Sequence, residues 1–181
     1  MKQSPSGAVF ETKDVKKAEY LQSILSRLND EVGTYFKLLE KYHELSAREV
    51  GFWSTLRMLM PIVEAVANVV GEKPQDFLGN HLDVKTPYLV WDLFRHSLIH
   101  GDLLQHAKYG IKEVDWGVGL NGLPHIIQNN HIGIDSKYIY LKLKEYLESQ
   151  VQTNDQSIVN IEVGVIYNNP KQEIIEDFSK L

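Results

Sequence analysis

Apolar residues recur at intervals of three and four over much of the chain, which is the spacing typical of amphipathic helices. The longest such stretch runs from Lys13 to about Ser46, and Gly33 is expected to bend it slightly. A helix of about thirty residues is about 45–50 Å long. This exceeds what a small bundle needs, so part of the helix is available for a dimer interface. Its apolar positions are Tyr20, Leu21, Ile24, Leu25, Leu28, Val32, Tyr35, Phe36, Leu39 and Tyr42.

A second helix is predicted from about Ala47 to Val70, with apolar positions dense enough to indicate burial on more than one side. Pro61 is expected to kink it or split it in two, because proline cannot donate the helical backbone hydrogen bond. Gly71 ends this helix, and residues 71–86 are predicted to form a connecting loop.

A third helix is predicted to begin at Pro87, because proline suits the first helical position, and Thr86 is the expected N-cap. Gly101 is the expected stop. Beyond Gly101-Asp102, a helical pattern continues to about Lys108.

The periodicity then changes. Residues 110–134, punctuated by glycine, asparagine and proline, are predicted to form a small β-hairpin or an irregular excursion. A fourth helix, capped by Asp135 or Ser136, is expected over about 137–150. Residues 158–167 alternate like a strand, and a short terminal helix is predicted to begin at Pro170.

Residues 1–11 are expected to be a flexible N-terminal arm and residues 12–181 a single helical domain. A chain of 181 residues with 43% hydrophobic and 24% charged residues has the composition of a globular protein with an ordinary core. The expected fold is mainly α, an antiparallel bundle of about four to five helices with a small β-hairpin excursion near 110–134.

Composition and charge exclude several classes of function. The chain has no cysteine, which excludes disulfides, thiolate chemistry and cysteine-ligated zinc. The net charge of −5 argues against coating long nucleic acid, although a local positive cleft remains compatible with it. The sequence shows no signal peptide and no apolar run of about 18 residues, so we expect a cytoplasmic protein without a membrane partner.

Candidate chemistry is concentrated in the stretch Val90–Asp102, VWDLFRHSLIHGD. At about 100° per residue, one helical sector is mostly apolar and can pack into a core. The opposite sector gathers a carboxylate, a guanidinium and two imidazoles, with Ile99 as the one apolar residue among Asp92, Arg95, His96 and His100. Arginine offers a fixed fork of donors for phosphate, and histidine exchanges a proton near neutral pH.

The sequence Arg95-His96-Ser97-Leu98-Ile99-His100 reads R-x4-H, with a polar residue directly after the arginine and Gly-Asp directly after the histidine. It resembles the signature of HEPN domains. The resemblance implies a small helical bundle that forms a homodimer, with the motif of each subunit lining one composite cleft. Many members of that family are metal-independent ribonucleases, and others are catalytically silent.

The resemblance implies that His100 takes or relays a proton while Arg95 holds the phosphate. His96 lies one turn before His100 and is expected to be a second acid, base or phosphate contact. The spacing places Asp92 where it can orient Arg95 or His96. Together with Asp92, two further residues complete the supporting set: Ser97 and Asp102.

The predicted function is therefore a metal-independent endoribonuclease, of the kind used in bacterial toxin–antitoxin or antiviral defence systems. It needs no cofactor, and its expected partners are a second copy of the chain, an RNA substrate such as tRNA or another structured RNA, and an antitoxin or regulatory protein. The main alternative is a catalytically silent HEPN-like module for dimerisation or for binding a protein or nucleotide. In that case Arg95 and His100 are structural residues near a helix C-terminus.

A zinc site is the third interpretation. His96 and His100 have the spacing of an HxxxH pair, but Ser97 stands where HExxH has its glutamate. A third ligand would have to come from Asp92, Asp102, His106 or a more distant histidine. The chain is predicted to use no metal. Elsewhere, His43, His81, His125 and His131 are expected at the surface or at helix ends, Trp53 and Trp91 in the core, and Trp116 packed over the end of the bundle or stacked on a base.

Overall fold

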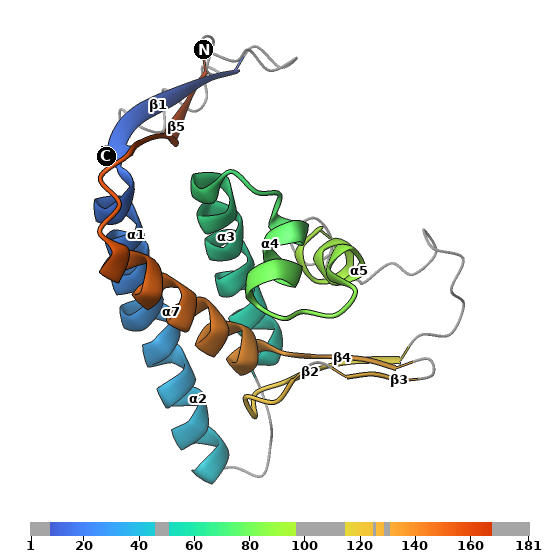
Figure 1. The fold of residues 1–181 in the computed structure, drawn as a ribbon. Helices are drawn as coiled ribbons and strands as arrows, with labels where there is room; N and C mark the ends of the chain where they lie inside the picture. Colours follow the sequence, from blue (N-terminus) through green and yellow to red (C-terminus); the bar gives the residue numbers. More distant parts are fainter. Residues whose placement is uncertain (1–7, 46–50, 97–114, 125, 129–130, 168–181) are drawn as a thin grey trace, which may run out of the picture.

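A computed structural model describes residues 8–45, 51–96, 115–124, 126–128 and 131–167. The chain is mainly α, as predicted (Figure 1). One long helical rod lies beside the helix near the C-terminal end, and three further helices pack on the other side. A two-stranded ribbon extends from one end of the helices, and a second small sheet extends from the side.

The helical rod consists of α1 (Lys17–Arg27), a π-helical segment η1 (Leu28–Gly33) and α2 (Thr34–Leu45). It begins four residues later than predicted, because 13–16 belong to strand β1 (Ala8–Lys16). Where a bend was expected at Gly33, the helix widens. A Cβ on that glycine would lie only 2.7 Å from the Tyr140 hydroxyl, so glycine permits the approach of the neighbouring helix.

Strand β1 pairs antiparallel with β5 (Ile158–Tyr167), the strand that the alternation predicted. Residues 8–11, which fall within the predicted flexible arm over 1–11, pair with β5. Residues 1–7 lie outside the described part of the chain.

Helix α3 (Phe52–Val70) runs through the middle of the bundle and contains Pro61 without being split. It is buried on several sides, as the density of apolar residues indicated. The prediction that Trp53 lies in the core is wrong, because this residue is 38% exposed. It lies in the first turn of α3 and covers Phe94, its ring centroid 6.3 Å from the phenylalanine ring.

The predicted loop over 71–86 contains a helix, α4 (Pro74–His81). Pro74 occupies the first turn, where its missing N–H costs nothing. Phe77 and Leu78 are fully buried, so packing stabilises a helix too short to be stable alone.

The third predicted helix begins at Pro87 as expected, with α5 (Pro87–Trp91) followed directly by a second π-helical segment, η2 (Asp92–His96). Thr86 stands at the predicted N-cap position with φ of 48°, and its side chain makes no capping hydrogen bond there. The remainder of the predicted helix lies outside the described residues.

The predicted β excursion contains three strands, β2 (Asp115–Gly119), β3 (Ile126–Gln128) and β4 (His131–Asp135). Strand β4 lies in the middle, antiparallel to β3 and parallel to β2. The chain then enters α7 (Ser136–Thr153), which Asp135 caps by accepting from the backbone N–H of Tyr138 at 2.8 Å. The terminal helix predicted from Pro170 lies outside the described residues.

The hydrophobic core surrounds α3, and side chains of α1, η1, α4, η2, β4 and α7 pack against it. Its fully buried large side chains are Leu21, Leu28, Leu56, Leu59, Met60, Phe77, Leu78, Leu82, Phe94, Ile134 and Ile139. Trp91 is buried, as predicted. The π-helical segment that carries Arg95 is therefore anchored through Trp91 and Phe94.

Candidate functional site

Arg95 is positioned from two sides. Its Nη2 donates to Oε2 of Glu64 on α3 at 2.7 Å, and its guanidinium carbon lies 5.8 Å from the Trp91 ring centroid. The arginine side chain is 18% exposed and the glutamate side chain 40%. The four-residue spacing of Trp91 and Arg95 puts both on one side of the turn, which explains the cation–π contact.

The Glu64 contact does not use the full donor capacity of the guanidinium. An arginine has five N–H donors, and Nε of Arg95 is buried without a hydrogen-bond partner. A buried donor without an acceptor costs free energy, and such groups call for an explanation. Because Nε itself is buried, a further anionic partner would have to approach the exposed part of the Arg95 side chain, which is 18% exposed in all.

The structure brings together only part of the predicted catalytic set. Asp92 and Arg95 both lie in η2 and are partly exposed. His96 ends η2, but only its backbone is described. Ser97, His100 and Asp102 lie outside the described residues, so the histidine roles stay predictions.

The π-helical winding at this position is itself unusual. Such segments are rare in proteins and occur frequently at functional sites. Their backbone hydrogen bonds join residues five apart, whereas those of an α-helix join residues four apart. The division of Val90–Asp102 into an apolar and a polar face assumes α-helical winding of about 100° per residue. Residues Asp92–His96 are wound as a π-helix instead.

The sequence analysis missed Glu64. It is the single acidic residue in the nineteen residues of α3 and stands in the C-terminal half of that helix, where Asn68 is the one other polar residue. A lone carboxylate among core positions is a signal for a buried or half-buried partner. The sequence could not identify that partner, which is 31 residues away.

Glu64 also lines a cleft of about 360 Å³ between α1, α3 and β5. The other lining residues are Tyr20, Pro61, Ala65, Asn68, Val69, Asn160, Ile161 and Glu162. The ion pair of Glu64 with Arg95 is therefore connected to a hollow on the surface of α3. Because Glu162 adds a second carboxylate, the cleft itself is not a phosphate site.

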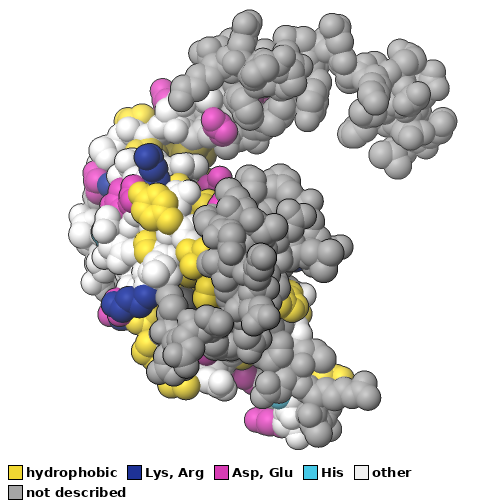
Figure 2. Space-filling view, turned by 90° about the vertical axis from the view of Figure 1, so that its right-hand side faces the viewer, with side chains coloured by type: hydrophobic (Ala, Val, Ile, Leu, Met, Phe, Trp, Pro, Cys, Tyr) yellow, Lys and Arg dark blue, Asp and Glu magenta, His cyan; other side chains and the backbone are white. Residues whose placement is uncertain are grey.

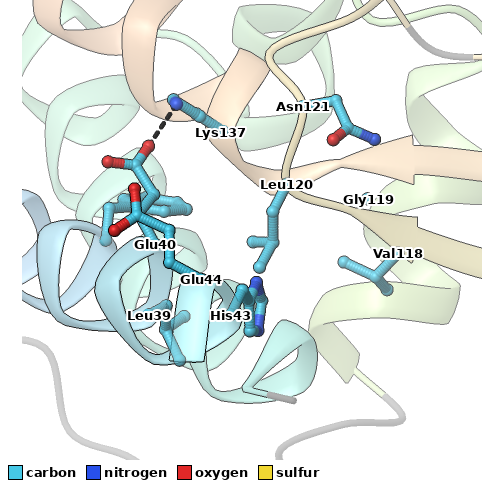
Figure 3. Close-up of a pocket in the computed structure, with 10 residues that line it drawn as sticks. Leu39, Glu40, His43, Glu44, Val118, Gly119, Leu120, Asn121 and Lys137 are labelled. Carbon is cyan, nitrogen blue, oxygen red and sulfur yellow. Dashed lines mark hydrogen bonds and ion pairs between the residues drawn. The ribbon is translucent and has the colours of Figure 1, made fainter. Parts of the chain in front are cut away.

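A larger cleft of about 510 Å³ lies between the end of α2, the residues after β2 and the start of α7 (Figure 3). Its apolar lining comes from Phe36, Leu39, Val118 and Leu120. Its polar lining comes from Glu40, His43, Glu44, Asn121 and Lys137.

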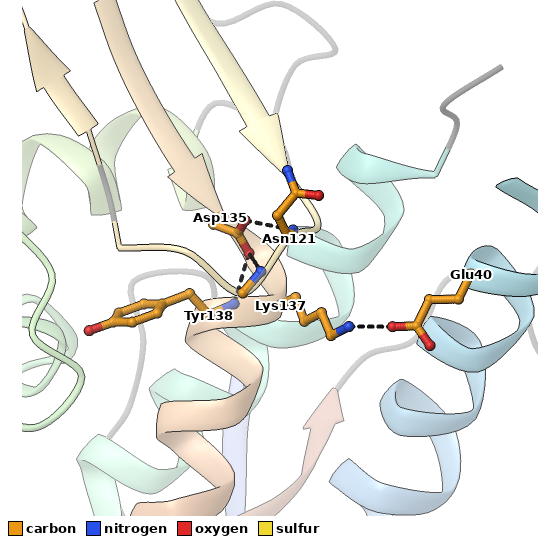
Figure 4. Close-up of polar contacts among 6 residues, drawn as sticks. Glu40, Asn121, Asp135, Lys137 and Tyr138 are labelled. Atoms are coloured by element: carbon orange, nitrogen blue, oxygen red, sulfur yellow. Dashed lines mark hydrogen bonds and ion pairs between the residues drawn. The ribbon is translucent and has the colours of Figure 1, made fainter. Parts of the chain in front are cut away.

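The rim of this larger cleft is held in place by the polar contacts of two residues, Lys137 and Asp135 (Figure 4). Lys137 of α7 is ion-paired with Glu40 of α2. The Asp135 carboxylate accepts from the backbone N–H groups of Asn121 and Gly122 at 2.8 and 3.1 Å, in addition to capping α7. Asp135 therefore fixes the turn that lines the cleft to the start of α7.

The charge of the larger cleft disfavours nucleic acid. Lys137 is neutralised by Glu40, and Glu44 adds a negative charge beside His43. Among the described residues on the face shown in Figure 2, Lys and Arg side chains lie beside Asp and Glu side chains. In the part of the chain that the structure describes, neither the cleft of about 360 Å³ nor the cleft of about 510 Å³ is lined by an arginine that could donate to a phosphate.

The chain matches no protein-family model, and it shows no significant similarity to a curated protein or to a solved structure. Among the described residues, no group of three His, Asp or Glu side chains is placed to hold a metal ion. No helix in the described part of the chain is long and apolar enough to cross a membrane.

Proposed function

We propose that this chain is a metal-independent endoribonuclease of the HEPN type that acts as a homodimer. The ribose 2′-oxygen attacks the adjacent phosphorus while a histidine accepts its proton. The bond from phosphorus to the 5′-oxygen breaks, and a second histidine or water protonates that oxygen. The products are a 2′,3′-cyclic phosphate and a 5′-hydroxyl. In this scheme His100 and His96 exchange protons, and Arg95 stabilises the charge on the phosphorane oxygens.

The single observation that carries the proposal is the placement of Arg95. The neighbouring residues Trp91 and Phe94 are buried and fix the backbone that carries Arg95. Glu64 orients its guanidinium group through a hydrogen bond. The Arg95 side chain keeps 18% of its surface exposed, so a phosphate that approaches this exposed part can accept from its N–H groups. An arginine held on a rigid element is what transition-state stabilisation requires, because its geometry is set before the substrate binds.

The π-helical winding of η2 supports the same proposal. It widens the turn that contains Arg95. Segments of this kind occur frequently at functional sites. Because η2 ends at His96, this support concerns Asp92 and Arg95, and His100 lies outside the described residues.

The proposal includes a second copy of the chain, because one motif supplies donors from one side of a scissile phosphate only. It also includes a cytoplasmic location and a structured RNA such as tRNA as substrate. A role in toxin or antiviral defence, with an antitoxin or regulatory partner, is proposed on the resemblance alone.

The second candidate function is a catalytically silent HEPN-like binding module. The Arg95–Glu64 ion pair favours it, because the arginine is mostly covered and already serves to connect η2 to α3. In such a module Arg95 contributes to stability and not to chemistry.

One experiment separates the two. Purified protein is incubated with total RNA and tRNA in EDTA, beside His100→Ala of the same oligomeric state and stability. Cleavage by the wild-type protein alone, with cyclic-phosphate ends, supports the ribonuclease. No cleavage of any RNA contradicts it and favours the module. Cleavage by both proteins contradicts the role given to His100.

A further inference from the structure

The outer face of α3 carries an aromatic ring, a cation and the Arg95 ion pair along one line. Trp53, Arg57, Pro61 and Glu64 are spaced by four, four and three residues, so they lie on the same side of the helix. Arg57 and Pro61 are exposed, and Trp53 is 38% exposed. The residues of α3 between them, Leu56, Leu59, Met60 and Val63, face the core and are fully buried.

Trp53 is held rigidly at one end of this line. Its ring lies nearly parallel to that of Phe94, with 20° between the planes and 6.3 Å between the centroids. Phe94 is fully buried in the core and directly precedes Arg95. One residue pair therefore fixes the indole to the same π-helical segment that carries the arginine of the motif.

We infer that Trp53 is a stacking platform for a base of single-stranded RNA, a few nucleotides from the phosphate held by Arg95, with Arg57 contacting the phosphate chain between them. This inference rests on the proposed function for the identity of the cleaved phosphate. Proteins that bind single strands combine aromatic rings with cations along a track, since every base has a π-face. Within α3 (Phe52–Val70), Glu64 is the single carboxylate, and it is the partner of Arg95.

The geometry limits which base is stacked. Trp53 and Glu64 are separated by eleven residues, or about 16 Å along a helix that rises 1.5 Å per residue. Stacked nucleotides rise by about 3.4 Å. The base on Trp53 is therefore within about five nucleotides of the cleaved bond.

The test uses labelled, fully 2′-O-methylated RNA of about 12 nucleotides, which cannot be cleaved by 2′-oxygen attack, and measures binding by anisotropy. Trp53→Leu keeps an apolar cover on Phe94 but removes the π-face, and we expect it to weaken binding by about 5- to 100-fold. Trp53→Phe should retain most of the affinity. Tyr42→Leu, which alters an exposed aromatic residue on α2, is the matched control and should bind like wild-type protein.

An abasic scan then separates stacking from a structural role. Removing the base that stacks on Trp53 should weaken RNA binding to the wild-type protein by about the same factor as Trp53→Leu does. The same abasic RNA should bind to Trp53→Leu no more weakly than the intact RNA does. Arg57→Ala should lower the slope of the logarithm of the binding constant against the logarithm of the salt concentration by about 1, because one phosphate contact is lost. The inference is overturned if Trp53→Leu binds like wild-type protein, if its loss is the same for every abasic position, or if the wild-type protein binds none of the oligomers. Binding with these properties, but without cleavage of unmodified RNA, would contradict the ribonuclease and leave the stacking site standing.

Discussion

Glu64 and Arg95 join two helices through a 2.7 Å contact between a carboxylate oxygen and Nη2 of the guanidinium. The pair connects the middle of α3 to the π-helical segment that contains the arginine of R-x4-H. This contact gives the arginine a fixed direction on the surface. It therefore serves both the fold and the proposed chemistry, and the two roles can be separated by substitution.

Replacing Glu64 by alanine should lower the free energy of unfolding by about 1 kcal/mol, because a charge-assisted hydrogen bond is lost at a partly exposed position. Glu64→Gln keeps an acceptor oxygen and should lose less. Urea denaturation measures both. Glu31→Ala is the control, since it removes an exposed pair with Arg27 at 3.6 Å and should change stability little. Equal losses in Glu64→Ala and Glu31→Ala would show that the contact with Arg95 is not stabilising.

Asp135 should be the more important carboxylate for stability. Its side chain accepts from three backbone N–H groups, and one of them is the N-cap bond of α7. Asp135→Ala should cost about 2–3 kcal/mol, because a lost cap alone costs about 1 kcal/mol and two further donors are left unpaired. Asp135→Asn should lie between alanine and wild type. A loss below about 0.5 kcal/mol for alanine would contradict the account of this turn.

Asp155 should make unfolding depend on pH below about 4. Hydrogen bonds from the backbone and side chain of Ser157, together with Lys17, lower the pKa of Asp155 from 3.8 to about 2. A carboxyl group with a lowered pKa in the folded state stabilises the fold above its unfolded pKa. That contribution is lost as the pH falls from about 4 to about 2.

Asp155→Asn should therefore flatten the pH dependence of the unfolding midpoint between pH 4 and 2. The measurement is a series of urea denaturation curves over that range. Asp30→Asn, an exposed aspartate on η1, serves as the control. An unchanged slope in Asp155→Asn would contradict the assignment.

The sequence predicted the elements whose signals are local. Helix α7 has a capping aspartate and periodic leucines, and β5 has period-two alternation, so both were found close to their observed bounds. Strand β1 was missed because its apolar and polar residues do not alternate and its partner is far along the chain, as the Asn160–Asp14 hydrogen bond shows. Helix α4 was missed because it is short and depends on the burial of Phe77 and Leu78.

The same limit applies to the candidate site. Arg95 was identified from its motif, whereas Glu64 could not be assigned to it because no local rule connects residues 31 apart. Trp53 was expected in the core because large aromatic residues usually are buried. Its position in the first turn of α3, over Phe94, is a tertiary property.

The most direct test of the central claim is a set of single-turnover cleavage rates in EDTA for the wild-type protein, Arg95→Ala, His100→Ala and the double variant. If both residues act on one phosphate, each single variant should be slower by about 100-fold or more. The double variant should then be little slower than either, because residues that act as a unit are not additive. Cleavage by folded Arg95→Ala at the wild-type rate would contradict the account and leave Arg95 as a structural partner of Glu64.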